Sequence, residues 1–223
     1  MRRYEVILFD LDGTLTNPFI GISQSVQYAL KKMGMDVPHT DELHSFVGPP
    51  IQESFVQKCH MTEPEVKMAI SYYRERYTDK GIFENEIYPG IEQLLGLLKD
   101  EGYHLIIATS KPTVFAERIA AHFSLDQYFD HIIGSFLDGN RSNKEAIINH
   151  IIALYPEYRP ADFLMVGDRM HDIIGAHKAG IDSIGVLYGY GSESELRQSK
   201  PLFLAESIGE LVSIFEAFKR VNT

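Results

Sequence analysis

The chain has 223 residues, 44% hydrophobic and 23% charged, which is ordinary for a globular protein with room for one α/β domain and an insertion. Its formal net charge of −10 argues against a nucleic acid polymer as partner, because such a partner needs a basic surface, but a small phosphate ester remains possible. Cys59 is the single cysteine and cannot form an internal disulfide, and no apolar run approaches the roughly 18 residues of a membrane span. We expect a cytoplasmic protein without membrane contact, as a monomer or a homodimer.

Short apolar runs alternate with amphipathic stretches along most of the chain. Each run is apolar throughout, as expected for strands covered on both faces. Strands that alternate with helices of this length indicate right-handed βαβ units around a parallel sheet. The expected strands are 6–9, 105–108, 132–133, 163–166 and 183–186, and the expected helices lie near 90–100, 113–123, 144–154, 171–179 and 208–218.

The segment 17–85 departs from this alternation, with three helical patterns and no convincing strand. The first helix has Asn17 as its N-cap, the second follows Gly48-Pro49-Pro50, and the third begins at Thr62, with Glu65 in the capping-box position. Helices with one apolar face must bury it against each other. We therefore expect an α/β fold whose Rossmann-like core, residues 1–16 and 86–223, carries an inserted all-helical cap, residues 17–85.

Three of the expected strands end in chemically distinctive polar residues. The first strand ends in Asp10, the second in Thr109 and Ser110, and the fourth is followed by Gly167 and Asp168. Ligands of parallel α/β sheets bind outside the carboxyl ends of the strands. We therefore expect these residues to meet at one site, although they are far apart in the sequence.

Asp10 and Asp12 follow four apolar residues, and buried carboxylates without a partner are costly. A cation, a proton or a substrate would explain the pair, and a solvated strand end is the plain alternative. Asp10 is the candidate nucleophile, because an aspartate can accept a phosphoryl group covalently. Asp12 points to the same side of the extended chain and would protonate the leaving oxygen and then activate water, with a pKa raised by its neighbour.

Asp168 and Asp172 add two more carboxylates, since a spacing of four places both on one face of a helix that begins near Asp168. Four carboxylates together require a cation, and an all-oxygen ligand set favours Mg²⁺ over Zn²⁺. We expect Asp10, the backbone carbonyl of Asp12, Asp168 and Asp172 to hold the metal, Asp172 either directly or through a water. Asp172 could instead only complement the helix dipole.

Lys144 is the candidate cation for a bound phosphate. Ser142 and Glu145 form a capping-box pattern that places Lys144 in the first turn of a helix, where a cation opposes the helix dipole. Binding of an anion by Lys144 would explain this unfavourable position. The alternative is that Lys144 is an ordinary surface lysine.

Thr109 and the backbone N–H of Ser110 are the other candidate phosphate ligands. They lie just before a predicted helix with Pro112 in its first turn, and helix N-termini bind phosphate readily. Lys111 is a weaker candidate for the same role.

Together these residues resemble the haloacid dehalogenase superfamily of Mg²⁺-dependent phosphatases. The four motifs occur in order, as Asp10-Leu11-Asp12-Gly13-Thr14, Thr109-Ser110, Lys144, and Gly167-Asp168 with Asp172. The resemblance implies an aspartyl-phosphate at Asp10, acid/base work by Asp12 and phosphoryl binding by Thr109 and Lys144. Segments 46–50 and 108–112 are similar to phosphoglycolate phosphatase-like proteins and closer still to a 5′-nucleotidase-like branch. Ser110 stands where the phosphoglycolate branch usually has asparagine, which disfavours phosphoglycolate.

The leading hypothesis is a phosphatase for a small phosphorylated metabolite, with phosphoglycolate, nucleotides, pyrophosphate and sugar phosphates as candidates. A phosphomutase shares all four motifs, and a non-enzymatic phospho-aspartate switch is a more distant alternative, since receiver domains are much shorter. The cap should exclude water and select the substrate, with Gly48-Pro49-Pro50 as a candidate specificity loop. The cap tyrosines are expected to pack, and Gly189-Tyr190-Gly191-Ser192 is expected to be a plain loop.

Overall fold

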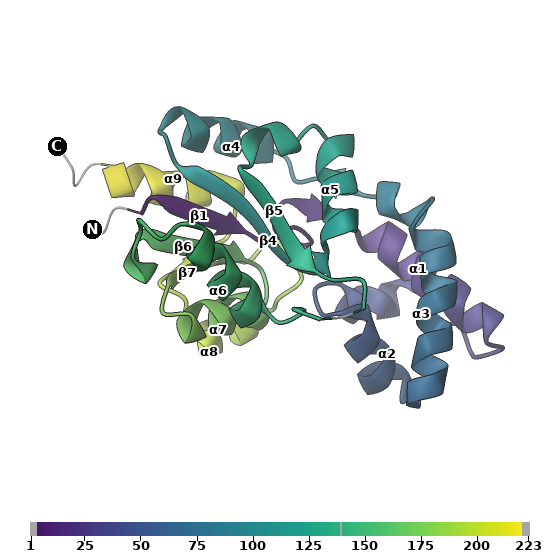
Figure 1. Cartoon of the computed structure of the whole chain (residues 1–223). Coiled ribbons are helices and arrows are strands. Elements are labelled where there is room, and N and C mark those ends of the chain that lie inside the picture. The colour runs from purple at the N-terminus through teal and green to yellow at the C-terminus, as the bar shows by residue number, and fades with distance from the viewer. Residues whose placement is uncertain (1–3, 139, 220–223) are drawn as a thin grey trace.

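The computed structural model describes residues 4–138 and 140–219, and six parallel strands in these ranges form one sheet (Figure 1). Their spatial order is β5-β4-β1-β6-β7-β8. The bounds are β1 (Val6–Phe9), β4 (His104–Pro112), β5 (His131–Ser135), β6 (Phe163–Gly167), β7 (Asp182–Val186) and β8 (Phe203–Ala205). The expected Rossmann-like α/β fold and its five expected strands are confirmed. The sequence did not reveal β8, because three residues at a sheet edge are too short to show a pattern.

Helices cover both faces of the sheet. They are α4 (Ile91–Asp100), α5 (Thr113–His122), α6 (Lys144–Leu154), α7 (Met170–Lys178), α8 (Glu193–Ser199) and α9 (Ile208–Lys219), with short 3₁₀ turns η3 (Asp126–Tyr128) and η4 (Pro160–Asp162). The five helices expected here are confirmed. The polar helix α8 was missed, because Leu196 is its one buried residue and one residue makes no periodicity.

Strand β1 is buried on both faces, which explains its uninterrupted apolar sequence. Its side chains alternate, so that Val6 and Leu8 join a hydrophobic cluster with α6 and α7. Ile7 and Phe9 join a larger cluster with α4, α5 and α9 on the other face. This burial fixes the carboxyl end of β1, and with it the position of the residues that follow.

The helices between the first two core strands form a group of their own at one end of the molecule (Figure 1). They are α1 (Phe19–Lys32), η1 (Thr40–Phe46), α2 (Ile51–Cys59), α3 (Glu63–Tyr77) and η2 (Gly81–Phe83). All three predicted α-helices are present, and the predicted capping box of Thr62 and Glu65 opens α3. That helix ends at Tyr77, before Gly81, where η2 begins. We keep the name cap for residues 17–85.

Two short strands lie where the chain passes between core and cap. They are β2 (Thr16–Asn17) and β3 (Glu86–Ile87), which pair antiparallel. The prediction of Asn17 as N-cap is wrong by one residue, since Pro18 takes that place and α1 begins at Phe19. The Asn17 side chain still accepts a hydrogen bond from the Phe19 N–H at 3.3 Å.

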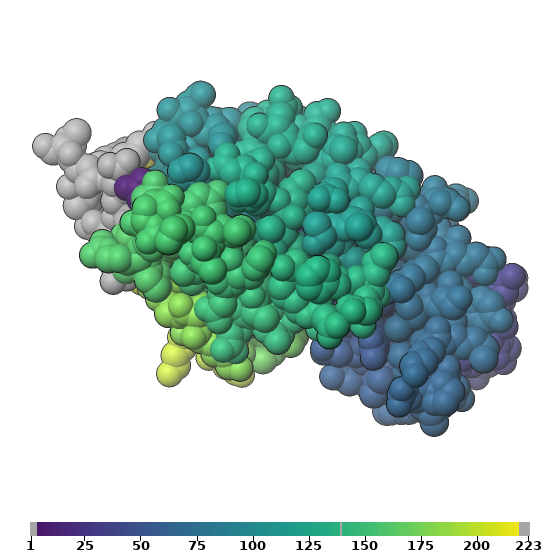
Figure 2. All heavy atoms as spheres, in the orientation of Figure 1, coloured from purple at the N-terminus to yellow at the C-terminus, as the bar shows by residue number. Residues whose placement is uncertain are grey.

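In the space-filling view the cap, in purple and blue, lies against the teal and green core (Figure 2). Across the described ranges, no helix is both long and apolar enough for a membrane crossing.

Candidate active site

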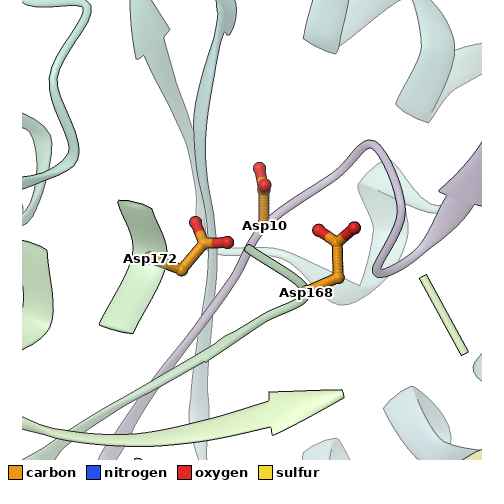
Figure 3. Close-up of side chains that lie close together, drawn as sticks. All are labelled: Asp10, Asp168 and Asp172. Carbon is orange, nitrogen blue, oxygen red and sulfur yellow. The ribbon is translucent and has the colours of Figure 1, made fainter. Parts of the chain in front are cut away.

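Three buried carboxylates converge at the carboxyl end of the sheet (Figure 3). Asp10 follows β1, Asp168 follows β6, and Asp172 lies in the first turn of α7, yet one oxygen of each lies within 4.8 Å of the others. Asp168 and Asp172 do not share a helical face, which corrects the prediction. Arg169 has an extended backbone and forms the N-cap, and its N–H donates to Asp172 at 3.0 Å, so the helix begins only at Met170.

Lys144 supplies a positive charge to this cluster. Its Nζ lies 2.8 Å from Oδ1 of Asp10 and 2.7 Å from Oδ1 of Asp172, and it donates to the Ala108 carbonyl at 2.7 Å. Burial alone would lower the pKa of Lys144, but the charges of Asp10 and Asp172 outweigh burial and raise it. The ammonium is therefore charged and offsets part of the negative charge of Asp10 and Asp172.

Lys144 is the first residue of α6, as the sequence predicted, but the predicted cap is wrong. Asn143 forms the N-cap and accepts from the Ala146 N–H at 2.8 Å, so the Ser142–Glu145 capping box does not form. Asn143 therefore satisfies the Ala146 N–H, one residue beyond the Glu145 N–H that Ser142 was expected to reach.

Asp12 is set apart from the three clustered carboxylates. Its Oδ2 lies 2.6 Å from Nζ of Lys111, and its buried Oδ1 has no hydrogen-bond partner among the residues described. Burial raises the pKa of Asp12 above its usual value, and Lys111 offsets part of that rise. A buried carboxylate with a raised pKa and an unsatisfied oxygen suits proton exchange with a bound substrate.

Thr109 and Ser110 line the same cavity as Asp10 and Asp12. They do not directly precede a helix, which corrects the prediction: β4 continues to Pro112 through a register irregularity, and α5 begins at Thr113. Buried Thr109 accepts from the Lys111 N–H at 3.3 Å, and Ser110 is half-buried. Phosphate contact would come from the bulged strand end itself, not from a helix terminus.

Asp168 rests in a tight cradle of glycines. Gly13 has a φ of +84°, and a Cβ on Gly13, Gly189 or Gly191 would overlap atoms of Asp168. The Tyr190 N–H also donates to Oδ2 of Asp168 at 2.7 Å. Burial and the charges of Asp172 and Asp10 raise the pKa of Asp168 well above its usual value.

The cradle corrects the prediction that Gly189-Tyr190-Gly191-Ser192 is a plain loop. This loop follows the carboxyl end of β7, so the rule that located the other strand ends could have located it. Its glycines contribute no functional group; they leave room for the Asp168 carboxylate because they have no side chain. A search for reactive side chains therefore does not find them.

The donor set fits a divalent cation. Four carboxylates, on Asp10, Asp12, Asp168 and Asp172, surround two ammonium groups, and ionisation of all of them leaves two uncompensated negative charges. Burial raises the pKa of Asp172 to about 6, although the charge of Lys144 opposes this rise. Oxygen-only ligands of this kind match the preference of Mg²⁺.

The cap completes the site. Gly48, Pro49 and Pro50, the candidate specificity loop, line the same cavity as Asp10. Tyr73 and Tyr77 of α3 line it as well and stack on each other, as expected, and the Tyr77 hydroxyl also accepts from Nζ of Lys111 at 2.6 Å.

A second cap contact comes from the core loop that follows β6. Nη1 of Arg169 donates to the Val47 carbonyl of the cap at 2.9 Å, and Nε donates to Glu195 at 2.9 Å. Arg169 lies directly after Asp168, so it links the cap, at the residue before Gly48-Pro49-Pro50, to the carboxylate cluster. The sequence offered no sign of this contact.

Comparison with known proteins places the fold and site in a family. The model of the haloacid dehalogenase-like hydrolases matches residues 7–186, and the chain belongs to this family. A 5′-nucleotidase from Pseudomonas aeruginosa is 46% identical over 216 residues, covering 96% of this chain and 97% of that protein. A phosphoglycolate phosphatase from Haemophilus influenzae is 28% identical, covering 95% and 98%.

Solved structures of similar proteins agree with this family assignment. That of a predicted phosphatase from Clostridium acetobutylicum has a TM-score of 0.93 and 45% identity, covering 97% of this chain and 100% of that chain. The chain is a phosphoric monoester hydrolase.

Proposed function

We propose that this chain is a Mg²⁺-dependent phosphatase that hydrolyses nucleoside 5′-monophosphates through a phosphorylated Asp10. One observation carries the proposal: Asp10 and Asp12 line one cavity but have different surroundings. Asp10 lies in the cluster with Lys144, Asp168 and Asp172, whereas Asp12 stands beside Lys111 with a raised pKa. One carboxylate is thereby suited to attack phosphorus and the other to move a proton.

The chemistry has two steps. A carboxylate oxygen of Asp10 attacks phosphorus, the bond from phosphorus to the ester oxygen breaks, and protonated Asp12 gives its proton to that oxygen. Asp12 then takes a proton from water, whose oxygen attacks phosphorus, releases phosphate and restores Asp10. Lys144 balances the negative charge of the phosphoryl group, with Thr109 and Ser110 as further contacts.

Asp10, the backbone carbonyl of Asp12, Asp168 and Asp172 would hold Mg²⁺. The metal would supply charge neutralisation that lets an anionic nucleophile approach an anionic phosphate. The glycine cradle around Asp168 and the hydrogen bond from Tyr190 hold that carboxylate in one orientation.

Two observations favour a nucleotide over phosphoglycolate. The 46% identity to a relative named 5′-nucleotidase exceeds the 28% identity to one named phosphoglycolate phosphatase, at similar coverage. Ser110 also departs from the asparagine usual in the phosphoglycolate branch.

The test compares the wild type with Asp10→Asn, using a nucleoside 5′-monophosphate and Mg²⁺. We expect the wild type to release phosphate and, after rapid acid quenching, to carry one phosphoryl group on the peptide that contains Asp10. The variant should do neither while keeping its circular dichroism spectrum. Full activity of Asp10→Asn would contradict the proposal. Phosphate moved to a second sugar hydroxyl would indicate a mutase, and a stable phospho-Asp10 without turnover would indicate a switch.

A further inference from the structure

The cavity over the catalytic residues is too small for a whole nucleotide. Its volume is about 70 Å³. Since one buried water needs about 10–15 Å³, the cavity holds roughly five to seven water-sized groups. That is the size of a phosphoryl group and the first atoms of its ester. The rest of a larger substrate must lie elsewhere.

A groove of about 340 Å³ adjoins this cavity, between α2 and α3 of the cap and the loop after β5. Figure 1 shows that loop running toward the two cap helices. Cavity and groove share part of their walls, and the shared residues are Pro50, Ile51, Arg74, Ser110 and Pro112. The groove is therefore a direct continuation of the catalytic cavity.

The direction of the reaction selects this groove over another hollow nearby. A second hollow of about 260 Å³ lies on the side of Lys144 and is lined by charged residues such as Glu145 and Lys178. The leaving oxygen must face Asp12, whose partner Lys111 donates to the Tyr77 hydroxyl of α3; Lys111 and Tyr77 line the catalytic cavity but not this second hollow. A leaving group on that side passes Arg74, one helical turn before Tyr77, and enters the groove.

The groove carries exposed apolar side chains for which the fold gives no reason. Val56, Phe136 and Leu137 are 47%, 52% and 45% exposed, and all three line it. Cζ of Arg141 lies 4.4 Å from the centroid of the Phe136 ring, which occupies one ring face and leaves the other for a ligand. Apolar walls with an exposed aromatic ring suit a flat, weakly polar group.

Polar groups are present at the edge of the same groove. Gln52 and Gln57 line it with side-chain amides that can both donate and accept. At the end of the groove next to the catalytic cavity, the Arg74 side chain is held by a hydrogen bond, in which Nη2 donates to the Leu137 carbonyl at 2.7 Å. A planar ring with donors and acceptors along one edge would match both the apolar walls and the polar side chains of the groove. A nucleobase has that chemistry.

We propose that this groove binds the nucleoside of a nucleoside 5′-monophosphate, with the base stacked on Phe136 and its edge facing Gln52 and Gln57. The proposal rests on the proposed function and adds the part of the site that distinguishes a nucleotide from its sugar phosphate. A two-carbon leaving group would leave the groove empty.

The test measures kcat/KM for adenosine 5′-monophosphate and for ribose 5-phosphate, which has the same ester without the base. We expect the wild type to prefer the nucleotide by roughly tenfold or more, the scale of one base-to-aromatic stack. In Phe136→Ala, kcat/KM for the nucleotide should fall while that for ribose 5-phosphate stays the same, so most of the preference is lost. Phe136→Tyr keeps an aromatic ring and should retain the preference. Phe83→Ala is the matched control, since Phe83 is also exposed, by 40%, and lies under Arg118, and it should alter neither substrate.

A second measurement does not depend on catalysis. Saturation-transfer NMR should detect adenosine bound to the wild type, and Phe136→Ala should weaken the signal strongly. Equal wild-type kcat/KM on both substrates, or an equal fall on both in Phe136→Ala, overturns the groove while the phosphatase stands. If neither ester releases phosphate, the proposed function is overturned. The NMR result then decides by itself whether the groove binds a nucleoside.

Discussion

The ammonium group of Lys111 lies 2.6 Å from Oδ2 of Asp12, and both side chains are almost completely buried. The same ammonium donates to the Tyr77 hydroxyl and lies 5.0 Å from the centroid of that ring. Lys111 therefore connects the end of β4, the cap helix α3 and Asp12. The two lysines of the site have different partners: Lys144 pairs with Asp10, the proposed nucleophile, and Lys111 pairs with Asp12, the proposed acid/base residue.

Replacing Lys111 by methionine should slow turnover and shift its pH dependence. Loss of the ammonium removes the influence that lowers the pKa of Asp12, so this pKa rises further. Asp12 must be ionised to take a proton from water, so the rising limb of kcat should move to higher pH. We expect kcat near neutral pH to fall roughly tenfold to a hundredfold. Lys58→Met, on an exposed cap lysine, is the control, and an unshifted profile for Lys111→Met would show that Lys111 does not act on Asp12.

The sequence could locate the carboxylates, because the rule that identifies them is local. Asp10 and Asp168 each follow a strand buried throughout, and parallel strands bring their carboxyl ends together. Lys144 was recognised because a cation in the first turn of a helix is a misfit. Each of these signals lies within about ten residues of the functional group.

The contacts that depend on the position of the cap could not be found in this way. Lys111 meets Tyr77, and Arg169 meets Val47, across 34 and 122 residues of sequence. No pattern in one segment encodes which distant segment will cover it. The glycine cradle was missed for another reason: it works through the absence of side chains.

Gly191→Ala should weaken Mg²⁺ binding. A Cβ at Gly191 would overlap the carbonyl oxygen of Asp168, which is backbone and cannot rotate away, so the Asp168 loop must shift. Misplacement of one ligand group should weaken metal affinity roughly tenfold to a hundredfold. Isothermal titration with Mg²⁺ measures this without turnover. In Gly209→Ala the nearest atom to the new Cβ lies 3.8 Å away, so this control should bind Mg²⁺ normally. Normal affinity in Gly191→Ala would mean that the cradle does not position Asp168.

Arg169→Met should release the specificity loop from the core. The variant loses the hydrogen bond to the Val47 carbonyl and the ion pair with Glu195. Hydrogen exchange should become faster in the peptide that spans Val47 to Pro50, and KM should rise several-fold. Arg159→Met is a matched control, because the Arg159 side chain is 81% exposed and pairs with Asp162, three residues along the chain and away from the cap. Unchanged exchange in Arg169→Met would show that the loop is held by other contacts.

The carboxylate cluster also predicts how metal binding depends on pH. The folded, metal-free protein holds protons on Asp168 and Asp172 that the unfolded chain would release, since their pKa values are raised, that of Asp172 to about 6. The folded state therefore binds more protons than the unfolded state between the usual carboxyl pKa and the raised one. The contribution of these groups to the free energy of unfolding must fall as pH rises through that interval.

Proposed Mg²⁺ binding requires the ionised carboxylates and would displace those protons, so the stabilising effect of the metal should grow with pH. Thermal unfolding with and without saturating Mg²⁺, from about pH 5 to about pH 8, should show a rise in Tm on metal addition that is small at the acid end and largest at the alkaline end. Comparing the two Tm values at each pH cancels groups elsewhere in the chain, because those titrate alike in both samples. Asp172→Asn should make the metal effect smaller and flatter with pH, since one titrating ligand is gone. A metal effect that stays constant or decreases toward alkaline pH would mean that these carboxylates are not the groups that bind Mg²⁺.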